Sequence, residues 1–400
     1  MKKNISKHRT AIVSVTVDHA VPYHDLLVRR LVENDWEVHF ISSGGEHLRN
    51  LDSRVIQHEI EMARQPDILK DLKSAIGWAR VIRAINPDLV VAGTPKASML
   101  GMLISRIFGV STRIYWVHGL RLETAKGLFL KFLLVLEKFT SKNATHLISV
   151  SRSLSDRLVE LKIAPPQKIQ LIGEGSTQGV DLRKFKPVGS GAAKRMLTES
   201  LGLLPDVPVV GFVGRLTLDK GIRELQQALI SLKTNGYSFQ VLFVGEFEDE
   251  ESAELVLQLE QLGVFTVKTG LVSETSDYYQ VMDIFCLPSY REGLPNVVLE
   301  AFASGVPVVG TNVTGISDLI ADRKTGLLVT AGDHTELQLA IESLFANTEL
   351  ATQIASNGLE YVRKNFDSEI VVEQQEKFLK SVMNEEKPKR KSLRKAWNRS

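Results

Sequence analysis

The sequence predicts an α/β protein built from two Rossmann-like, doubly wound domains that face each other across a cleft. Three observations lead to this fold. The chain has 400 residues, which is too many for one ordinary hydrophobic core. Short β-branched segments alternate with helical segments along most of it. Several strand segments end in glycine or polar residues, as strands do where a parallel sheet binds ligands.

The first half of the chain supplies one such alternation. Its strand candidates are short apolar runs, and its helix candidates carry apolar residues at helical spacing. The expected strands are 11–17, 36–42, 88–92, 113–117, 144–150 and 168–172, and the expected helices are 19–34, 68–85 and 97–108. Residues 127–139 are strongly apolar. We expect them to pack in the core, and the alternative is a patch at a membrane interface.

The second half repeats the pattern after a linker rich in Pro, Gly and Ser at residues 187–193. We place the domain boundary there, between a first domain of residues 1–187 and a second of residues 188–368. A final helix is expected at 370–382, within a segment 369–386, and a basic tail follows at 387–400. The strands expected in the second domain are 207–213, 240–244, 265–269, 284–288, 306–310 and 326–329.

The composition excludes several classes of protein. Hydrophobic residues at 44% and charged residues at 24% are typical of a soluble globular chain, and a net charge of +2 gives no field that would attract nucleic acid. The single cysteine, Cys286, is expected in a buried strand, which excludes intrachain disulfides and fits a reducing cytoplasm. We expect neither a signal peptide nor a spanning helix, because the apolar runs are too short.

Residues 291–315 are the most informative stretch. Glu292 and Glu300 lie on either side of a Gly-Leu-Pro-Asn turn. Pro295 suits the first position of a helix, where its missing N–H has no helical partner, and Gly305 marks the stop. A helix of about three turns is therefore expected.

The start of that helix predicts an anion site. The amides of Asn296, Val297 and Val298 would point out of the positive end of the helix dipole, which suits phosphate. A second basic feature follows the strand that ends at Gly214. Arg215 and Lys220 lie five residues apart and can both reach over the strand end toward one anion.

Taken together, these motifs resemble the retaining glycosyltransferases of family 4, which have the GT-B fold. The run R-E-G-L-P-N-V-V-L-E at 291–300 resembles their E-x7-E segment, and G-R-L-T-L-D-K-G at 214–221 resembles their donor-site motif. The resemblance covers most of the chain and is strongest over 211–329. It implies that the final helix crosses back onto the first domain.

The resemblance also implies roles for individual residues. Glu292 would lie beside the transferred sugar, and His118, at the end of a first-domain strand, would lie near the sugar and the acceptor. These two are the candidate catalytic residues. The candidate donor-binding residues are Arg215 and Lys220 for the diphosphate, Glu300 for the ribose, Val272 for the base, and the turn formed by Gly293, Leu294, Pro295, Asn296 and Val297.

The implied activity is transfer of a hexosyl or N-acetylhexosaminyl unit from a nucleoside diphosphate sugar, expected to be a UDP-sugar, without a metal or other cofactor. The strings at 94–97, 118–124 and 173–181 resemble members that build bacterial surface polysaccharides, often on a lipid diphosphate. We therefore expect a saccharide or lipid-linked acceptor and a cytoplasmic location. The basic tail could contact the anionic inner face of the membrane.

Two alternatives stay open at this stage: a nucleotide-sugar epimerase of the same fold, and a non-catalytic nucleotide-sugar-binding subunit. A dinucleotide dehydrogenase is disfavoured because no G-x-G-x-x-G follows the first strand. The chain departs from the family at 17–21, where many members carry a Gly-Gly turn, and at Asp318, whose role the sequence does not assign.

Overall fold

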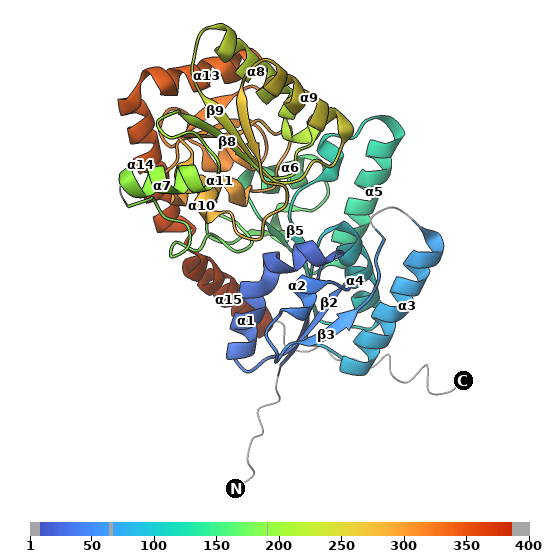
Figure 1. Ribbon diagram of the computed structural model, residues 1–400. Helices are drawn as coiled ribbons and strands as arrows, with labels where there is room; N and C mark the ends of the chain where they lie inside the picture. The colour runs from blue at the N-terminus through green and yellow to red at the C-terminus, as the bar shows by residue number, and fades with distance from the viewer. Residues whose placement is uncertain (1–8, 64–66, 190, 386–400) are drawn as a thin grey trace, which may run out of the picture.

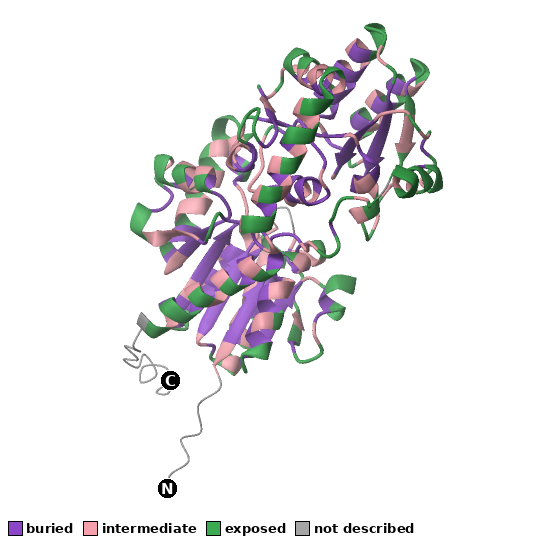
Figure 2. Ribbon diagram, turned by 90° about the vertical axis from the view of Figure 1, so that its left-hand side faces the viewer, coloured by how far each residue is buried: buried purple, intermediate pink, exposed green. Residues whose placement is uncertain are grey.

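The computed structural model describes residues 9–63, 67–189 and 191–385, which form two α/β domains (Figure 1). The first contains a seven-stranded sheet of order β3-β2-β1-β4-β5-β6-β7, and the second a six-stranded sheet of order β10-β9-β8-β11-β12-β13. The paired strands of both sheets run parallel. Buried residues concentrate in the strands of the two halves (Figure 2). The predicted fold is confirmed.

The first domain contains the expected strands and one more, β3. The expected helix 19–34 is divided into a 3-10 turn and α1, because Pro22 has no N–H to donate to a helical ladder. The elements are β1 (Thr10–Ser14), η1 (Asp18–His24), α1 (Asp25–Glu33), β2 (Glu37–Ser42), α2 (Glu46–Arg49), β3 (Ile56–Glu59), α3 (Ile68–Ile85), β4 (Leu89–Gly93), α4 (Pro95–Ile107), β5 (Thr112–Val117), η2 (Arg121–Glu123), α5 (Gly127–Asn143), β6 (His146–Ser149), α6 (Arg152–Glu160), η3 (Pro166–Lys168) and β7 (Ile169–Leu171).

The second domain follows the same alternation, and Cys286 is buried on its strand β11, as predicted. The boundary near residue 187 stays a prediction. The elements are α7 (Gly191–Ser200), β8 (Val209–Val213), η4 (Leu218–Lys220), α8 (Ile222–Thr234), β9 (Gln240–Val244), α9 (Glu250–Gln261), β10 (Phe265–Lys268), α10 (Ser276–Val281), β11 (Ile284–Leu287), α11 (Asn296–Ala303), β12 (Val308–Thr311), α12 (Ile316–Leu319), β13 (Leu327–Val329), α13 (His334–Ala346), α14 (Thr348–Asn365) and α15 (Ser368–Glu385).

The helix predicted after Glu292 is shorter than expected. Pro295 is the N-cap of α11 and not its first helical residue, and the helix has eight residues. The amide of Val298 donates to the carbonyl of Pro295 at 3.1 Å, so it is not available to an anion as predicted. Gly305 adopts φ 71° just beyond the end of the helix, which explains the stop.

The expectation that residues 127–139 pack in the core holds for one face of the segment and is wrong for the other. They belong to α5, which packs mainly on α4 and also contacts β5 and η2. Leu128 is 83% exposed, Phe132 46% and Val135 64%. Leu133 and Leu134, by contrast, are partly buried against the first-domain core. The run is apolar on both faces, so hydrophobicity alone could not distinguish a buried helix from a half-exposed one.

Helix α15 crosses from the second domain onto the first, as the resemblance implies. It packs beside α1, where Arg30 pairs with Glu369 at 2.9 Å. Leu379, near the far end of the helix, is 2% exposed within the core cluster of the first domain. The last described helix therefore contributes to a core far from it in sequence.

We expect Leu379→Ala to lower the free energy of unfolding by about 2–4 kcal/mol, because it removes buried methyl groups and leaves a cavity. Denaturant titration of the purified chain measures this change. The control is Lys377→Ala on the same helix, whose side chain is 70% exposed and whose loss should change stability little. Equal effects of the two substitutions would contradict the packing described for α15.

Candidate active site between the two domains

The two domains meet where strand β5 of the first faces the turn before α11 of the second. A Cβ atom added to Gly293 would lie 1.8 Å from the carbonyl oxygen of His118, so only glycine permits this backbone contact. Leu294 packs against the core clusters of both domains. The contact brings the backbone of His118 against the residue that follows Glu292.

The loop after β8 brings Lys220 to this junction of the two domains, next to Glu292. Its Nζ lies 2.5 Å from Oε1 of Glu292, and the two side chains are only 18% and 13% exposed. The hydroxyl of Ser289 donates to the same carboxylate oxygen at 2.8 Å. The structure thus joins two residues that are 72 positions apart in the chain.

Arg215 lies in the same loop but has a different partner. It pairs with Glu248 at 2.5 Å, and about half of its side chain is exposed. Burial of the hydroxyl and then the charge of Glu292 raise the pKa of Tyr23 in the first domain, and the charge of Arg215 opposes this rise. The charge of Arg215 therefore still acts in the gap between the domains. The two predicted cations are therefore near each other but not paired to one common acid.

A polar network fixes the loop that carries Lys220. Asp219 accepts a hydrogen bond from Thr217 at 2.6 Å and an ion-pair contact from Arg291 at 3.2 Å. The amide of Tyr290 donates to the carbonyl of Asp219 at 3.0 Å. These bonds connect the loop after β8, which carries Lys220, to the segment after β11, which carries Glu292. The positions of the two residues are therefore coupled.

The residues predicted to bind the ribose and the base lie further along the second domain. Glu300 lies in α11, where the hydroxyl of Thr275 approaches its Oε2 at 3.5 Å and burial raises the pKa of its carboxyl. Val272 is partly buried against the second-domain core, a few residues before Thr275. Helix α10, which begins after Thr275, packs on α11. The predicted ribose and base residues thus belong to adjoining elements.

His118 is part of an aromatic cluster that sequence reasoning missed. Its ring centroid lies 5.1 Å from that of His24 and 5.4 Å from that of Tyr23. Among the described residues, neither nitrogen of His24 nor Nε2 of His118 has a hydrogen-bond partner, and all three atoms are enclosed. Both rings lie against Gly93, where a Cβ would come within 3 Å of each. The sequence feature nearest to this cluster was the departure from the family pattern at residues 17–21, just before Tyr23.

Burial lowers the pKa of His118 from its ordinary value of 6.5 to about 4. The imidazole is then neutral at physiological pH and cannot serve as a positive charge. A neutral imidazole keeps one donor nitrogen and one acceptor nitrogen. Burial also lowers the pKa of His24, and the neighbouring His118 adds to that effect.

Asp318, which the sequence left without a role, joins the two domains. Its Oδ1 accepts a hydrogen bond from the amide of Ser153 at 2.9 Å, and its Oδ2 contacts the hydroxyl of the same serine. The amide of Gly315 donates to Ser153 Oγ at 2.9 Å. Nearby, Thr314 donates to Glu123 at 2.8 Å. The start of α6 lies close to Asp318, so the short side chain of an aspartate is long enough to bond Ser153 there.

A hollow of about 480 Å³ opens between the domains beside the loop that carries Lys220. It supports the predicted cleft, although the predicted donor residues themselves are not part of its wall. Within the described residues, no three His, Cys, Asp or Glu side chains are grouped so that they could hold a metal ion. Metal independence stays a prediction. The hollow is lined by Glu123, Thr124, Ala125 and Lys126 from the first domain and by Leu218, Asp219, Arg223, Glu224 and Tyr290 from the second.

Two family models match the chain, Glycosyltransferase Family 4 over residues 23–176 and Glycosyl transferases group 1 over residues 194–361. The capsular polysaccharide biosynthesis glycosyltransferase CapM of Staphylococcus aureus is 34% identical over 378 residues, which cover 94% of this chain and 98% of CapM. The chain is a family-4 glycosyltransferase. This confirms the family that the sequence motifs indicated.

Other similar proteins agree with the assignment. The UDP-Gal:alpha-D-GlcNAc-diphosphoundecaprenol alpha-1,3-galactosyltransferase of Escherichia coli is 27% identical over 277 residues, or 68% of this chain and 70% of that one. Sucrose-phosphate synthase from Thermosynechococcus elongatus has a TM-score of 0.82 at 20% identity over 94% of this chain and 100% of its own. HepE of Anabaena, solved with UDP-glucose, has a TM-score of 0.79 at 21% identity, and the match covers 94% of this chain and 100% of HepE. These structures establish the GT-B fold of the glycosyltransferase.

The enclosed neutral His118 makes the stability of the glycosyltransferase depend on pH. The unfolded chain binds a proton at His118 below pH 6.5, whereas the folded chain does so only below about pH 4. Acidification through this window therefore favours unfolding. We expect His118→Asn to reduce the loss of stability across the window by about 2–3 kcal/mol.

Denaturant titrations at the two ends of the window measure this difference. His47→Asn, at an exposed position of α2, is the control and should leave the pH dependence unchanged. Some dependence will remain in the His118 variant because His24 acts in the same direction. Identical pH profiles for wild type and His118→Asn would contradict the enclosed neutral imidazole.

Proposed function

We propose that this glycosyltransferase moves a hexosyl or N-acetylhexosaminyl unit from a UDP-sugar to a saccharide acceptor, with retention at the anomeric carbon and without a metal. The observation that carries the proposal is the contact of Lys220 with Glu292 at the junction of the domains. A cation that can leave its carboxylate for a phosphate, beside an acid and a neutral histidine from the opposite domain, is what a diphosphate leaving group and a reacting sugar need.

In this proposal the second domain binds the donor. Lys220 and Arg215 bind the diphosphate together with the amides of Asn296 and Val297 at the start of α11. Glu300 accepts hydrogen bonds from the ribose, and the backbone near Val272 meets the base. The present partners of Lys220 and Arg215 are both carboxylates, so each cation exchanges one anionic partner for another when the donor binds.

The transfer step then needs no strong protein acid. The bond from the anomeric carbon to the diphosphate oxygen breaks, and the bond to the acceptor oxygen forms on the same face of the sugar. The acceptor proton passes to the departing phosphate oxygen, which the cations stabilise. Glu292 and His118 orient the sugar and stabilise the positive charge that develops on it, and no covalent glycosyl-enzyme forms.

We further propose that the acceptor is a saccharide on a lipid diphosphate, used in building a bacterial surface polysaccharide at the cytoplasmic face of the membrane. The names of relatives support this. The E. coli relative carries diphosphoundecaprenol in its name, as does an N,N'-diacetylbacillosaminyl-diphospho-undecaprenol transferase of Campylobacter jejuni that is 26% identical over 340 residues. No helix among the described residues has the length and hydrophobicity to span a bilayer. The basic tail predicted to contact lipid lies outside those residues.

Removal of either member of the Lys220–Glu292 pair should reduce turnover by at least ~100-fold, because each acts on charge that develops in the transition state. The variants are Lys220→Ala and Glu292→Gln. Initial rates are measured with a panel of UDP-sugars and lipid diphosphate-linked saccharides, and NMR of the product gives the anomeric configuration. Lys233→Ala, at an exposed position near the end of α8, is the control and should retain wild-type rates.

Near-wild-type turnover in both variants would refute the assigned roles, and an inverted product would refute retention. NMR of the donor without acceptor separates the alternatives. Conversion of the donor to its epimer would indicate an epimerase, and donor binding with no turnover in the wild type would indicate a binding subunit.

A further inference from the structure

His24 is a buried histidine that has no hydrogen-bond partner among the described residues. It is the last residue of η1, it is 1% exposed, and both of its ring nitrogens are enclosed. An enclosed nitrogen without a partner loses its hydrogen bonds to water and gains none in return, which is unfavourable. A phenyl ring of similar size would fill the same place without this cost. Packing alone therefore does not account for an imidazole at this position.

The Nε2 atoms of His24 and His118 approach one point beside Gly93. A Cβ atom added to Gly93 would lie 2.5 Å from Nε2 of His118 and 2.8 Å from Nε2 of His24. The two rings meet edge to face, with centroids 5.1 Å apart. His24 also meets the ring of Trp116 edge to face, at 5.2 Å, so its own orientation is restricted. We call the space that glycine leaves here the Gly93 notch.

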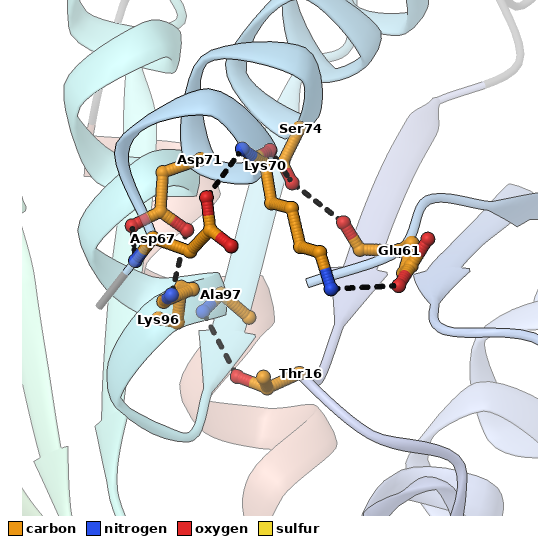
Figure 3. Close-up of polar contacts among 8 residues, drawn as sticks. All are labelled: Thr16, Glu61, Asp67, Lys70, Asp71, Ser74, Lys96 and Ala97. Atoms are coloured by element: carbon orange, nitrogen blue, oxygen red, sulfur yellow. Dashed lines mark hydrogen bonds and ion pairs between the residues drawn. The ribbon is translucent and has the colours of Figure 1, made fainter. Parts of the chain in front are cut away.

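The turn that carries Gly93 is held in a strained conformation. Thr94 adopts φ 66°, which is unfavourable for a β-branched residue and persists only where the surroundings enforce it. Its Oγ1 accepts a hydrogen bond from the amide of Thr16 at 2.8 Å. Figure 3 shows that the hydroxyl of Thr16 in turn accepts from the amide of Ala97 at 3.1 Å. The end of β1 therefore fixes the turn between β4 and α4.

A second set of contacts holds the start of α4 against α3 (Figure 3). Nζ of Lys96 lies 2.6 Å from the carboxylate of Asp71, and the two side chains are only 12% and 25% exposed. Moving one partner away would leave a largely buried charge unpaired, which is costly. The turn is thus held from two sides, and the position of Gly93 between the two imidazoles is fixed with it.

The surroundings of Nε2 decide which group the other nitrogen of His118 can offer. Nε2 is enclosed without a partner, whereas the ring is otherwise partly exposed, so Nδ1 is the nitrogen that can reach a substrate. A neutral imidazole carries its proton on one nitrogen, and the partner of that nitrogen or of the other sets which one it is. Two ring nitrogens that face one notch avoid repulsion when one has a proton and the other a lone pair. The proton position on His24 therefore governs the proton position on His118.

We propose that His24 is a positioning residue for the sugar transfer, because it holds the imidazole of His118 in one orientation and one tautomer. Nδ1 of His118 then offers the same group to a sugar hydroxyl in every turnover. His24 itself does not touch the substrate, since both of its nitrogens are enclosed. The control of the tautomer is a property of the folded chain, whereas its effect on turnover rests on the proposed function.

NMR of the full chain labelled with 15N-histidine tests the control of the tautomer without donor or acceptor. A single neutral tautomer gives two well-separated ring-nitrogen signals, and a mixture gives averaged signals. The wild type at neutral pH should show one tautomer at His118, whose signals are assigned by their loss in His118→Asn. His24→Phe keeps a ring and removes both nitrogens of residue 24, so it should give averaged signals.

Two further variants sharpen this measurement. Gly93→Ala keeps both histidines but places a Cβ atom in the Gly93 notch, so it should also give averaged signals. The matched control is His39→Phe, at a histidine of β2 that is 5% exposed and bonds His58 at 2.9 Å, outside this cluster. It should leave the signals of His118 unchanged. Circular dichroism and thermal unfolding verify that each variant folds.

Initial rates with UDP-sugars and lipid diphosphate-linked saccharides separate a positioning role from a packing role. His24→Phe should lower kcat by about tenfold or more, as loss of a residue that orients a functional imidazole does, and change the KM for the donor by less than about twofold. His24→Gln keeps an amide that can donate or accept at the notch, so it should retain more of kcat than His24→Phe. If the ring of His24 only filled space, the phenyl variant would be the more active of the two.

Three results would overturn the proposal: a mixture of tautomers at His118 in the wild type, unchanged His118 signals in His24→Phe, or higher turnover in His24→Phe than in His24→Gln. A chain that shows one tautomer under the control of His24 but transfers no sugar would contradict the proposed function and leave the control of the tautomer intact.

Discussion

The contact of Gly293 with the end of β5 is the constraint on which the rest of the site depends. The absence of a side chain at Gly293 lets the turn before α11 approach the carbonyl of His118, so the two domains touch at this point. Glu292 is then carried into the half-buried gap, within reach of Lys220. Leu294 packs against the hydrophobic cores of both domains at this junction. The hydrogen bonds between Asp318 and Ser153 hold the same two domains together at a second point.

The electrostatics of the site follow from that geometry. A lysine and a glutamate that are both mostly buried lose much of their hydration, and their attraction repays this loss only where the geometry is good and further hydrogen bonds are present. Ser289 supplies one such bond to Glu292. A diphosphate carries more negative charge than a carboxylate and can compete for Lys220. Under the proposed function, the ion pair thus holds the lysine in position until the donor replaces its partner.

The sequence predicted the local structure from Glu292 to Glu300 better than the surroundings of His118, for a physical reason. The donor motif from Glu292 to Glu300 lies within one turn and one helix, so its geometry is local and can be inferred from residue spacing. Even there, the helix began one residue late and ended early. The cluster of Tyr23, His24 and His118 comes from two separate segments that meet only in the folded sheet. The departure from the family pattern at residues 17–21 lies beside one of these segments but does not indicate that it contacts the other. The exposure of one face of α5 was also not predicted. A helix that is apolar on all sides gives no indication of which face packs against the rest of the protein.

A crystal structure of the glycosyltransferase with UDP tests the central claim most directly. The account predicts that a β-phosphate oxygen lies within hydrogen-bond distance of Lys220 Nζ and of the amides that begin α11, and that Lys220 has left the carboxylate of Glu292. A diphosphate bound elsewhere, such as in the hollow beside Tyr290, with the Lys220–Glu292 pair still intact, would contradict it.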